Sequence, residues 1–235
     1  MSLDYARRGF AEFIGAFALV FVGVGSVIAN NDLLTSAVAH GLVIAVFVSA
    51  FGGISGGHFN PAVTFGFLVT RRIQPSMAVF YWVVQLLGAA FGALLIRWIF
   101  PPIRAVFDGA PQLNTTIGSG KGMVVEGVLT FFLVLVVFAT AVEPDGAYEK
   151  IAGLAIGFTI LLDITMGGRL TGAAMNPARA FGPELVSGHW ADAWVWYVGP
   201  LAGGALAALL YDRLYLSSAK VEPEPHTVAE TPRKR

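Results

Sequence analysis

The sequence predicts an all-α membrane protein with six membrane-spanning helices and two shorter re-entrant helices that enter the membrane without crossing it. Three observations lead to this fold class: an apolar composition, apolar stretches of spanning length, and a motif that occurs once in each of two repeats. Of the 235 residues, 56% are hydrophobic and 13% are charged, whereas about 25% of the residues of a soluble domain are charged. The composition therefore excludes an ordinary soluble domain.

The composition also excludes several functions. The chain has 15 basic and 15 acidic residues, so its balanced charge offers no basic surface for nucleic acid. It has no cysteine, which excludes disulfides and thiolate chemistry. Its four histidines lack metal-ligand spacing, and its glycines form no phosphate-binding loop. We therefore expect no metal, no cofactor and no catalysis.

Six apolar stretches are long enough to cross a bilayer, which takes about 20 residues. They cover about 9–29, 35–54, 76–99, 122–142, 149–168 and 192–216. The first stretch lacks a small-residue cleavage site, so we expect it to be retained and not removed as a signal peptide. These stretches define one membrane domain over 1–217, and the polar, proline-containing segment 218–235 is predicted to be a disordered cytoplasmic tail.

The basic residues predict that both termini are cytoplasmic. Segments on the same side as the N-terminus carry Arg7, Arg8, Arg71 and Arg72 and more Lys and Arg in total than the opposite segments. Such an excess marks the cytoplasmic side. We expect a multi-pass protein of a plasma or inner membrane.

The triplet Asn-Pro-Ala occurs twice, as Asn60, Pro61 and Ala62 and as Asn176, Pro177 and Ala178. Asn is a favoured residue just before a helix, and Pro is favoured at the first helical position. Each triplet therefore predicts the start of a helix. The first would run to about Arg71 and cover roughly 17 Å, against a hydrocarbon core of roughly 30 Å. Two such half-helices meeting end to end would make one span.

The two triplets belong to two repeats, over about 8–100 and 122–216. Three segment pairs match at nearly the same offset: 11–23 with 125–137, Asn60 with Asn176, and 86–95 with 201–210. Each repeat has three full spans, an odd number, so the second copy must enter the membrane upside down. The two half-helices are then expected to enter from opposite faces. Small residues such as Gly88 and Gly92 are expected to bring spans together inside the bundle, with a dimer motif as the alternative.

These features resemble the aquaporins of the major intrinsic protein family. The resemblance covers residues 8–216 and rests on the doubled triplet together with Arg179, three residues after Asn176. It implies an aquaporin-like bundle of six helices and two half-helices, assembled as a homotetramer. It also implies a separate pore in each subunit for water and small neutral solutes.

The triplets themselves suggest how such a pore works. The Asn side-chain oxygen caps its helix, so the amide N–H groups of Asn60 and Asn176 are expected to point into the lumen as donors. The two helix N-termini add about half a positive charge each. Cations and hydronium would be repelled there, whereas neutral solutes would feel far less of this field.

The loops before the triplets resemble the family's ladder of backbone carbonyls. The residues concerned are Gly56, Gly57, His58, Phe59, Gly172, Ala173 and Ala174. For the glycines, a role in tight turns alone is an equal alternative. His58 is expected to pack within its loop. Glu12 and Glu126 occupy equivalent repeat positions, where the resemblance implies that they hold loop backbone; a proton relay is the alternative.

The resemblance places the narrow filter at His40, Ile164, Ala173 and Arg179. Strict water channels usually carry Phe and His where this chain has His40 and Ile164, and the quartet is similar to that of plant vacuolar aquaporins. Ile and Ala should widen the constriction and remove a donor, which predicts permeation of water and also of ammonia. A histidine bonded only to a neighbour and a structural ion pair of Arg179 are the alternatives.

Three other functions are alternatives. A glycerol or urea facilitator of the same family is the first, although the glycerol branch usually carries Asp and Lys where this chain has Ala180 and Glu184. A proton- or sodium-coupled transporter is the second, but it would need an ionisable group at the midplane, where this chain has neutral Asn. A purely structural, junctional role would predict negligible flux. The sequence assigns no firm role to Asp163 or Glu184.

Overall fold

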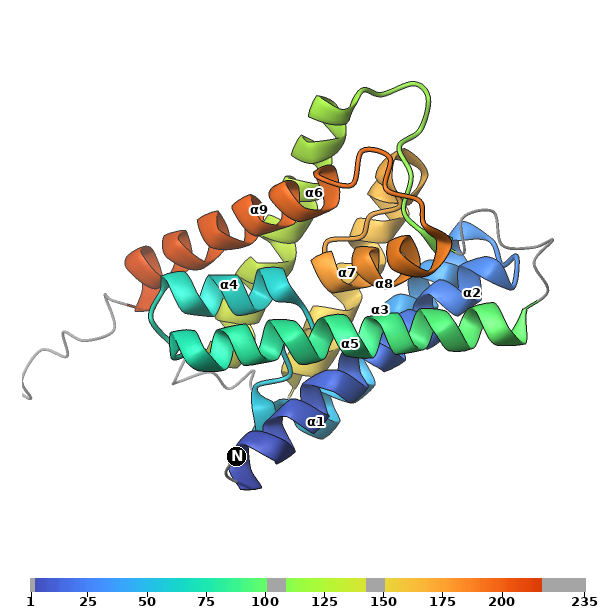
Figure 1. Ribbon diagram of the computed structural model, residues 1–235. Coiled ribbons are helices and arrows are strands. Elements are labelled where there is room, and N and C mark those ends of the chain that lie inside the picture. The colour runs from blue at the N-terminus through green and yellow to red at the C-terminus, as the bar shows by residue number, and fades with distance from the viewer. Residues whose placement is uncertain (1–2, 101–108, 143–150, 217–235) are drawn as a thin grey trace, which may run out of the picture.

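The computed structural model describes residues 3–100, 109–142 and 151–216. Across these ranges every regular element is a helix and no strand occurs, as the predicted fold class requires (Figure 1). The predicted tail, 218–235, lies outside the described residues.

The helices follow the order of the two repeats. The first repeat contains α1 (Leu3–Ala18), the π-helical segment η1 (Leu19–Val24), α2 (Gly25–Ile28), α3 (Leu33–Ser55), α4 (Pro61–Val69) and α5 (Pro75–Ile99). The second contains α6 (Ser119–Val137), η4 (Phe138–Val142), α7 (Ala152–Thr171), α8 (Pro177–Ser187), α9 (Val195–Tyr211) and η6 (Asp212–Leu216). Both repeats therefore have two long helices, a short one and a third long one.

Five helices of the described chain are long and apolar enough to cross a membrane: Leu3–Ile28, Leu33–Ser55, Pro75–Ile99, Ser119–Val142 and Ala152–Thr171. The sixth predicted span corresponds to α9 followed by η6; α9 has 17 residues and is not among these five. The first helix begins earlier than hydropathy indicates, at Leu3. Its polar first turns carry an ion pair between Asp4 and Arg8, with an N–O distance of 2.9 Å. A search for apolar stretches does not detect such polar turns.

The two short helices begin where the triplets predict. The Asn60 side-chain oxygen accepts a hydrogen bond from the Ala62 amide at 2.8 Å, and that of Asn176 accepts one from the Ala178 amide at 2.9 Å. The α4 helix ends at Val69, shortly before Arg71, whose φ is 58°. Figure 1 shows α4 and α8 in line with each other alongside α5. The two half-helices together thus take the place of a seventh span.

The long helices pack through small residues. A Cβ atom on Gly88 would clash with the carbonyl oxygen of Phe13 in α1, and one on Gly203 would clash with that of Gly127 in α6. A Cβ on Gly92 would also lie 3.0 Å from the Phe17 carbonyl oxygen of α1. These glycines therefore contact neighbours inside the bundle, as predicted, and the alternative of a dimer motif at Gly88 and Gly92 is wrong.

Candidate functional site

The two Asn-Pro-Ala loops are joined to each other at the centre of the bundle. The Asn60 amide nitrogen donates to the Met175 carbonyl at 2.9 Å, and the Asn176 amide nitrogen donates to the Phe59 carbonyl at 2.9 Å. Each amide group carries two N–H bonds, so one is engaged across the junction and one remains. The expectation that these amides donate into the lumen can therefore apply to only one N–H bond of each, because the opposite loop takes the other.

Glu12 and Glu126 are fully buried and bind the same loops. Glu12 accepts hydrogen bonds from Ser55 Oγ at 2.6 Å, His58 N at 2.9 Å, Phe59 N at 2.7 Å and Gln85 Nε2 at 2.7 Å. Glu126 accepts them from Thr171 Oγ1 at 2.6 Å, Ala174 N at 3.0 Å and Met175 N at 2.7 Å. Both carboxylates thus accept hydrogen bonds from loop N–H groups. These groups have no helical partner, and the membrane supplies no water for them at this depth.

A further pair of contacts anchors the C-terminal ends of the helices that precede the loops. The Tyr81 hydroxyl donates to the Ser55 carbonyl at 2.7 Å, and the Trp196 indole N–H donates to the Thr171 carbonyl at 2.9 Å. The sequence reasoning missed all four residues. Ser55 and Thr171 occupy the same position relative to the two triplets, and this correspondence was a signal that could have identified them.

The backbone of the two loops takes left-handed conformations at matching positions. The φ values are 93° at Gly56, 63° at Gly57 and 49° at Phe59, and 82° at Gly172, 43° at Ala173 and 51° at Met175. Non-glycine residues adopt such values rarely and at a cost in energy. The carbonyl of Phe59, expected in the ladder, is the acceptor for Asn176 and so also holds the junction together.

One cavity lies on the side of the junction where Gly56, Gly57 and His58 run, and we name it the inner cavity. Its volume is about 40 Å³, and a buried water needs at least about 10–15 Å³ of such space. It is lined by Asn60, Asn176 and Met175 and by apolar side chains from several helices, namely Leu19, Ile44, Val48, Val63, Leu133, Val137, Ala141, Ile156 and Ile160. It therefore has room for a short file of waters.

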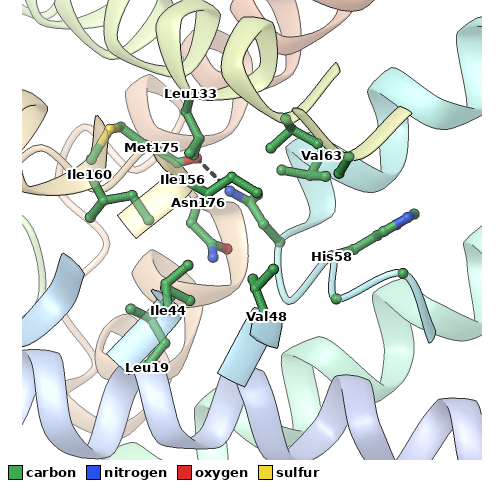
Figure 2. Close-up of a pocket in the computed structure, with 15 residues that line it drawn as sticks. Leu19, Ile44, Val48, His58, Val63, Leu133, Ile156, Ile160, Met175 and Asn176 are labelled. Carbon is green, nitrogen blue, oxygen red and sulfur yellow. Dashed lines mark hydrogen bonds between the residues drawn. The ribbon is translucent and has the colours of Figure 1, made fainter. Parts of the chain in front are cut away.

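Figure 2 shows the inner cavity with the Asn176 side chain at its centre, between Ile44 on one side and Ile156 on the other. The dashed line marks the bond between the Met175 carbonyl and the Asn60 amide. The His58 ring points away from this centre. It lies 4.3 Å from the Phe67 ring, centroid to centroid, and its Nδ1 is 3.0 Å from Thr64 Oγ1. His58 thus lines the cavity with its backbone and not with its imidazole.

A second cavity, of about 390 Å³, lies on the Arg179 side of the junction, and we name it the outer cavity. Three of the four predicted filter residues, His40, Ile164 and Arg179, line it. The fourth, Ala173, is 2% exposed and follows Gly172, which also lines the outer cavity. The segment 109–112 covers one side of this cavity, a contribution that the sequence reasoning did not include. Ala174, which we expect in the carbonyl ladder, is the next residue of this loop, and its amide donates to Glu126.

His40 and Arg179 both bring unpaired polar atoms to this region. His40 Nδ1 lies 2.8 Å from the Ser36 carbonyl, so Nδ1 donates and Nε2 is the acceptor of the neutral ring. His40 Nε2 and the Nε and Nη1 atoms of Arg179 are buried and have no hydrogen-bond partner among the described residues. The ring of His40 lies against Gly23, where a Cβ atom would be 2.6 Å from its Cδ2.

No group of three His, Asp or Glu side chains that could hold a metal ion occurs in 3–100, 109–142 or 151–216. Three of the buried carboxyls have different hydrogen-bond partners. Glu12 and Glu126 are bonded to separate loops, and Glu184 is bonded to the Tyr197 hydroxyl. The site thus consists of two cavities on either side of a neutral amide junction.

Known proteins are similar to this chain in sequence and in fold. The family model of the major intrinsic proteins matches residues 1–211. The chain is 44% identical to aquaporin TIP4-4 of Zea mays, over 93% of this chain and 90% of that protein. It is 41% identical to the probable aquaporin TIP3-2 of Arabidopsis thaliana, over 95% of this chain and 89% of that protein.

A solved structure agrees with these relatives. The aquaglyceroporin from Plasmodium falciparum superposes with a TM-score of 0.78 at 25% sequence identity, over 89% of this chain and 96% of that chain. The match of the family model to residues 1–211, together with these relatives over about nine-tenths of their length, establishes that the chain belongs to the major intrinsic protein family.

Proposed function

We propose that this chain is a passive membrane channel for water that excludes protons and other ions. It is an integral multi-pass protein of a family whose members are channels and not enzymes. The observation that carries the proposal is the junction of the half-helices, where two Asn amides meet beside a cavity large enough for a file of waters. An uncharged junction beside a cavity lined mostly by apolar side chains favours uncharged molecules.

Proton exclusion follows from the donors at the junction. Each Asn amide retains one N–H bond, and a water that accepts from both turns its own hydrogens outward toward the two mouths. The hydrogen bonds along the file of waters then do not all point the same way. A proton therefore cannot be passed from water to water through the junction. The N-termini of α4 and α8 add positive potential at the same place, where an ion has lost most of its hydration shell.

The outer cavity is the proposed filter, with His40, Ile164, Ala173 and Arg179 as its residues. Its support is that three of these residues line one cavity, and that the fourth, Ala173, directly follows Gly172, which also lines it. Ile164 supplies no hydrogen-bond donor to the filter. This lowers the free-energy cost of entry for neutral solutes other than water. We therefore include ammonia among the solutes, with urea and glycerol as the alternative solutes of the same channel.

A coupled transporter has less support. Such proteins need an ionisable group that faces the solute at the midplane, and the two midplane side chains are Asn60 and Asn176. Glu12 and Glu126 have their oxygens engaged by backbone amides and by Ser55 or Thr171. These bonds support a scaffold role for both glutamates and leave a proton relay without an entry point.

The test is a solute panel on the purified protein in proteoliposomes. Stopped-flow shrinkage should give a water permeability well above that of empty vesicles, and it should not depend on an imposed proton gradient. Ammonia influx, followed by an internal pH dye, should exceed that of empty vesicles. Water flux without ammonia flux would refute the ammonia part alone. Flux that requires a proton gradient would favour a transporter, and no flux would favour a structural role.

We further propose a homotetramer with both termini in the cytoplasm, as the family resemblance and the distribution of Lys and Arg imply. Cross-linking in native membranes tests the assembly. The curated relatives are TIP-type aquaporins, which does not support the plasma membrane that we expected from the sequence.

A further inference from the structure

Arg179 stands out among the buried charges of the described chain, because it is the only buried Lys or Arg there. It is 5% exposed, and its Nε and Nη1 atoms have no hydrogen-bond partner among the described residues. A buried cation without a partner is costly unless a carboxylate lies close enough to compensate its charge. The electrostatics of the outer cavity therefore depend on the carboxylates near Arg179.

Glu126 and Glu184 are the carboxylates whose charges act on Arg179, and neither forms a direct salt bridge with it among the described residues. Glu126 is already engaged by Thr171 and by two backbone amides. The third buried acid of this half, Asp163, has Glu126 as its charged neighbour and not Arg179. Of the two glutamates, Glu184 is the one with a carboxylate oxygen that has no hydrogen-bond partner among the described residues.

Glu184 is held in a defined position. It is 1% exposed, and its Oε2 accepts a hydrogen bond from the Tyr197 hydroxyl at 2.6 Å. Its Oε1 is buried and unpaired among the described residues, like two nitrogens of Arg179. Arg179 and Glu184 lie on the same helix, α8, five residues apart, which is about 7.5 Å along the axis. Glu184 does not line the outer or the inner cavity.

We propose that Glu184, held by Tyr197, balances the charge of Arg179 and thereby determines how strongly the outer cavity rejects anions relative to cations. Glu184 acts through Arg179 and does not contact the solute. With the carboxylate in place, the guanidinium can donate to a passing solute without making the cavity strongly positive. Without it, the cavity carries one additional positive charge, and small anions are attracted to the filter. The inference rests on the proposed channel function.

The test compares Glu184→Gln with the native chain in proteoliposomes, measuring nitrate conductance and water permeability in the same preparation. Glutamine keeps an acceptor for Tyr197 and removes only the charge. The ratio of nitrate conductance to water permeability should rise roughly tenfold, as a unit charge on a nearby residue implies in a medium of intermediate dielectric constant. Asp192→Asn is the matched control, because Asp192 is an exposed acid whose field is screened by salt, and its ratio should stay at the native value.

Two further variants separate this role from a structural one. In the background of Arg179→Val, the Glu184→Gln change should leave the ratio unaltered, because no guanidinium remains to be balanced. Tyr197→Phe removes the hydroxyl that holds Glu184 and should raise the ratio in the same direction, which keeps the proposal testable if Glu184→Gln does not fold. An unchanged ratio in a folded Glu184→Gln channel with native water flux overturns the inference. A native chain that conducts no water overturns the proposed function instead.

Discussion

At the scale of single residues, the two buried glutamates decide where the pore loops lie. Glu12 and Glu126 take up backbone amides on both sides of the junction, His58 and Phe59 on one side and Ala174 and Met175 on the other. A loop at membrane depth has no water to satisfy these amides. One carboxylate in each repeat therefore replaces the hydrogen bonds that a helix would have supplied.

The Glu126→Gln variant tests this role. Glutamine has one acceptor oxygen in place of two and turns an N–H group toward backbone donors, so we expect a loss of about 3 kcal/mol in unfolding free energy and a lower water permeability. Denaturant unfolding in detergent and stopped-flow shrinkage measure the two effects. Asp4→Asn is the control, because its exposed ion pair with Arg8 contributes at most about 0.5 kcal/mol. Equal stability of Glu126→Gln and the control would contradict the assignment.

The position of His40 depends on a glycine. A Cβ atom at Gly23 would lie 2.6 Å from His40 Cδ2 and 2.7 Å from Nε2, so Gly23→Ala must displace the imidazole that lines the outer cavity. We expect a changed ratio of ammonia to water permeability, with a loss of about 1–3 kcal/mol in stability from overpacking. Gly53→Ala is the matched control, since a Cβ there meets nothing within 4 Å. An unchanged ratio would exclude His40 from the filter.

Ala173 offers a chemical probe of the same filter. The chain has no cysteine, so the native protein should be insensitive to mercurials. We expect Ala173→Cys to lose most of its water permeability on addition of a mercurial and to recover it with a thiol reductant. Stopped-flow shrinkage before and after treatment gives the result. Insensitivity of a folded, active Ala173→Cys channel would place residue 173 away from the water path.

At the scale of helices, the bundle depends on backbone-to-backbone approach between partners in each repeat. The α1 and α5 helices meet at Gly88, and α6 and α9 meet at Gly203. The first and second repeats are joined in the same way, since a Cβ at Gly41 of α3 would lie 2.5 Å from the Gly157 carbonyl of α7. Lipid provides no hydrophobic drive for helix association, so close packing of this kind has to provide it.

Gly88→Leu should therefore disrupt folding and not only assembly. Its side chain would meet the carbonyl of Phe13, which is backbone and cannot move aside, so we expect a loss of about 3 kcal/mol or more. Thermal unfolding of the detergent-solubilised protein measures it. Gly53→Leu, on the open face of α3, should unfold at nearly the native temperature. A Gly88→Leu protein that unfolds at the native temperature would contradict this packing role of Gly88.

At the scale of the whole molecule, two inverted repeats produce one pore with two unequal ends. The junction is nearly symmetric, from the Asn cross-links to the Tyr81 and Trp196 contacts. The surroundings are not: Gln85 binds Glu12 on one side, whereas Arg179 and Glu184 are buried on the other. The scaffold is therefore repeated, whereas the proposed filter lies on one side only.

The orientation of the whole chain is open to measurement. The excess of Lys and Arg predicts cytoplasmic termini, so a C-terminal epitope tag should be digested by protease in inside-out vesicles and protected in right-side-out ones. A tag inserted after Gly118, in the loop before α6, should behave in the opposite way. Protection of the C-terminal tag in inside-out vesicles would reverse the assigned topology.

Local chemistry explains why so much of this fold could be predicted. Hydropathy identifies the spans, since a bilayer requires about 20 apolar residues, and the Asn and Pro pairs start the half-helices by capping, a contact between close neighbours in the chain. The odd number of spans in each repeat then requires inversion. By itself, the sequence of this chain determined its helices, their order and the place where two of them stop halfway.

The tertiary structure alone decided which atoms meet. The Asn60 amide binds a carbonyl 115 residues away, and the Asn176 amide binds one 117 residues away. Glu184 of α8 accepts a hydrogen bond from Tyr197 of α9, and the segment 109–112 covers one side of the outer cavity. No local pattern encodes such contacts, because they depend on how closely glycine-bearing helices approach and on the direction in which each loop then leaves its helix.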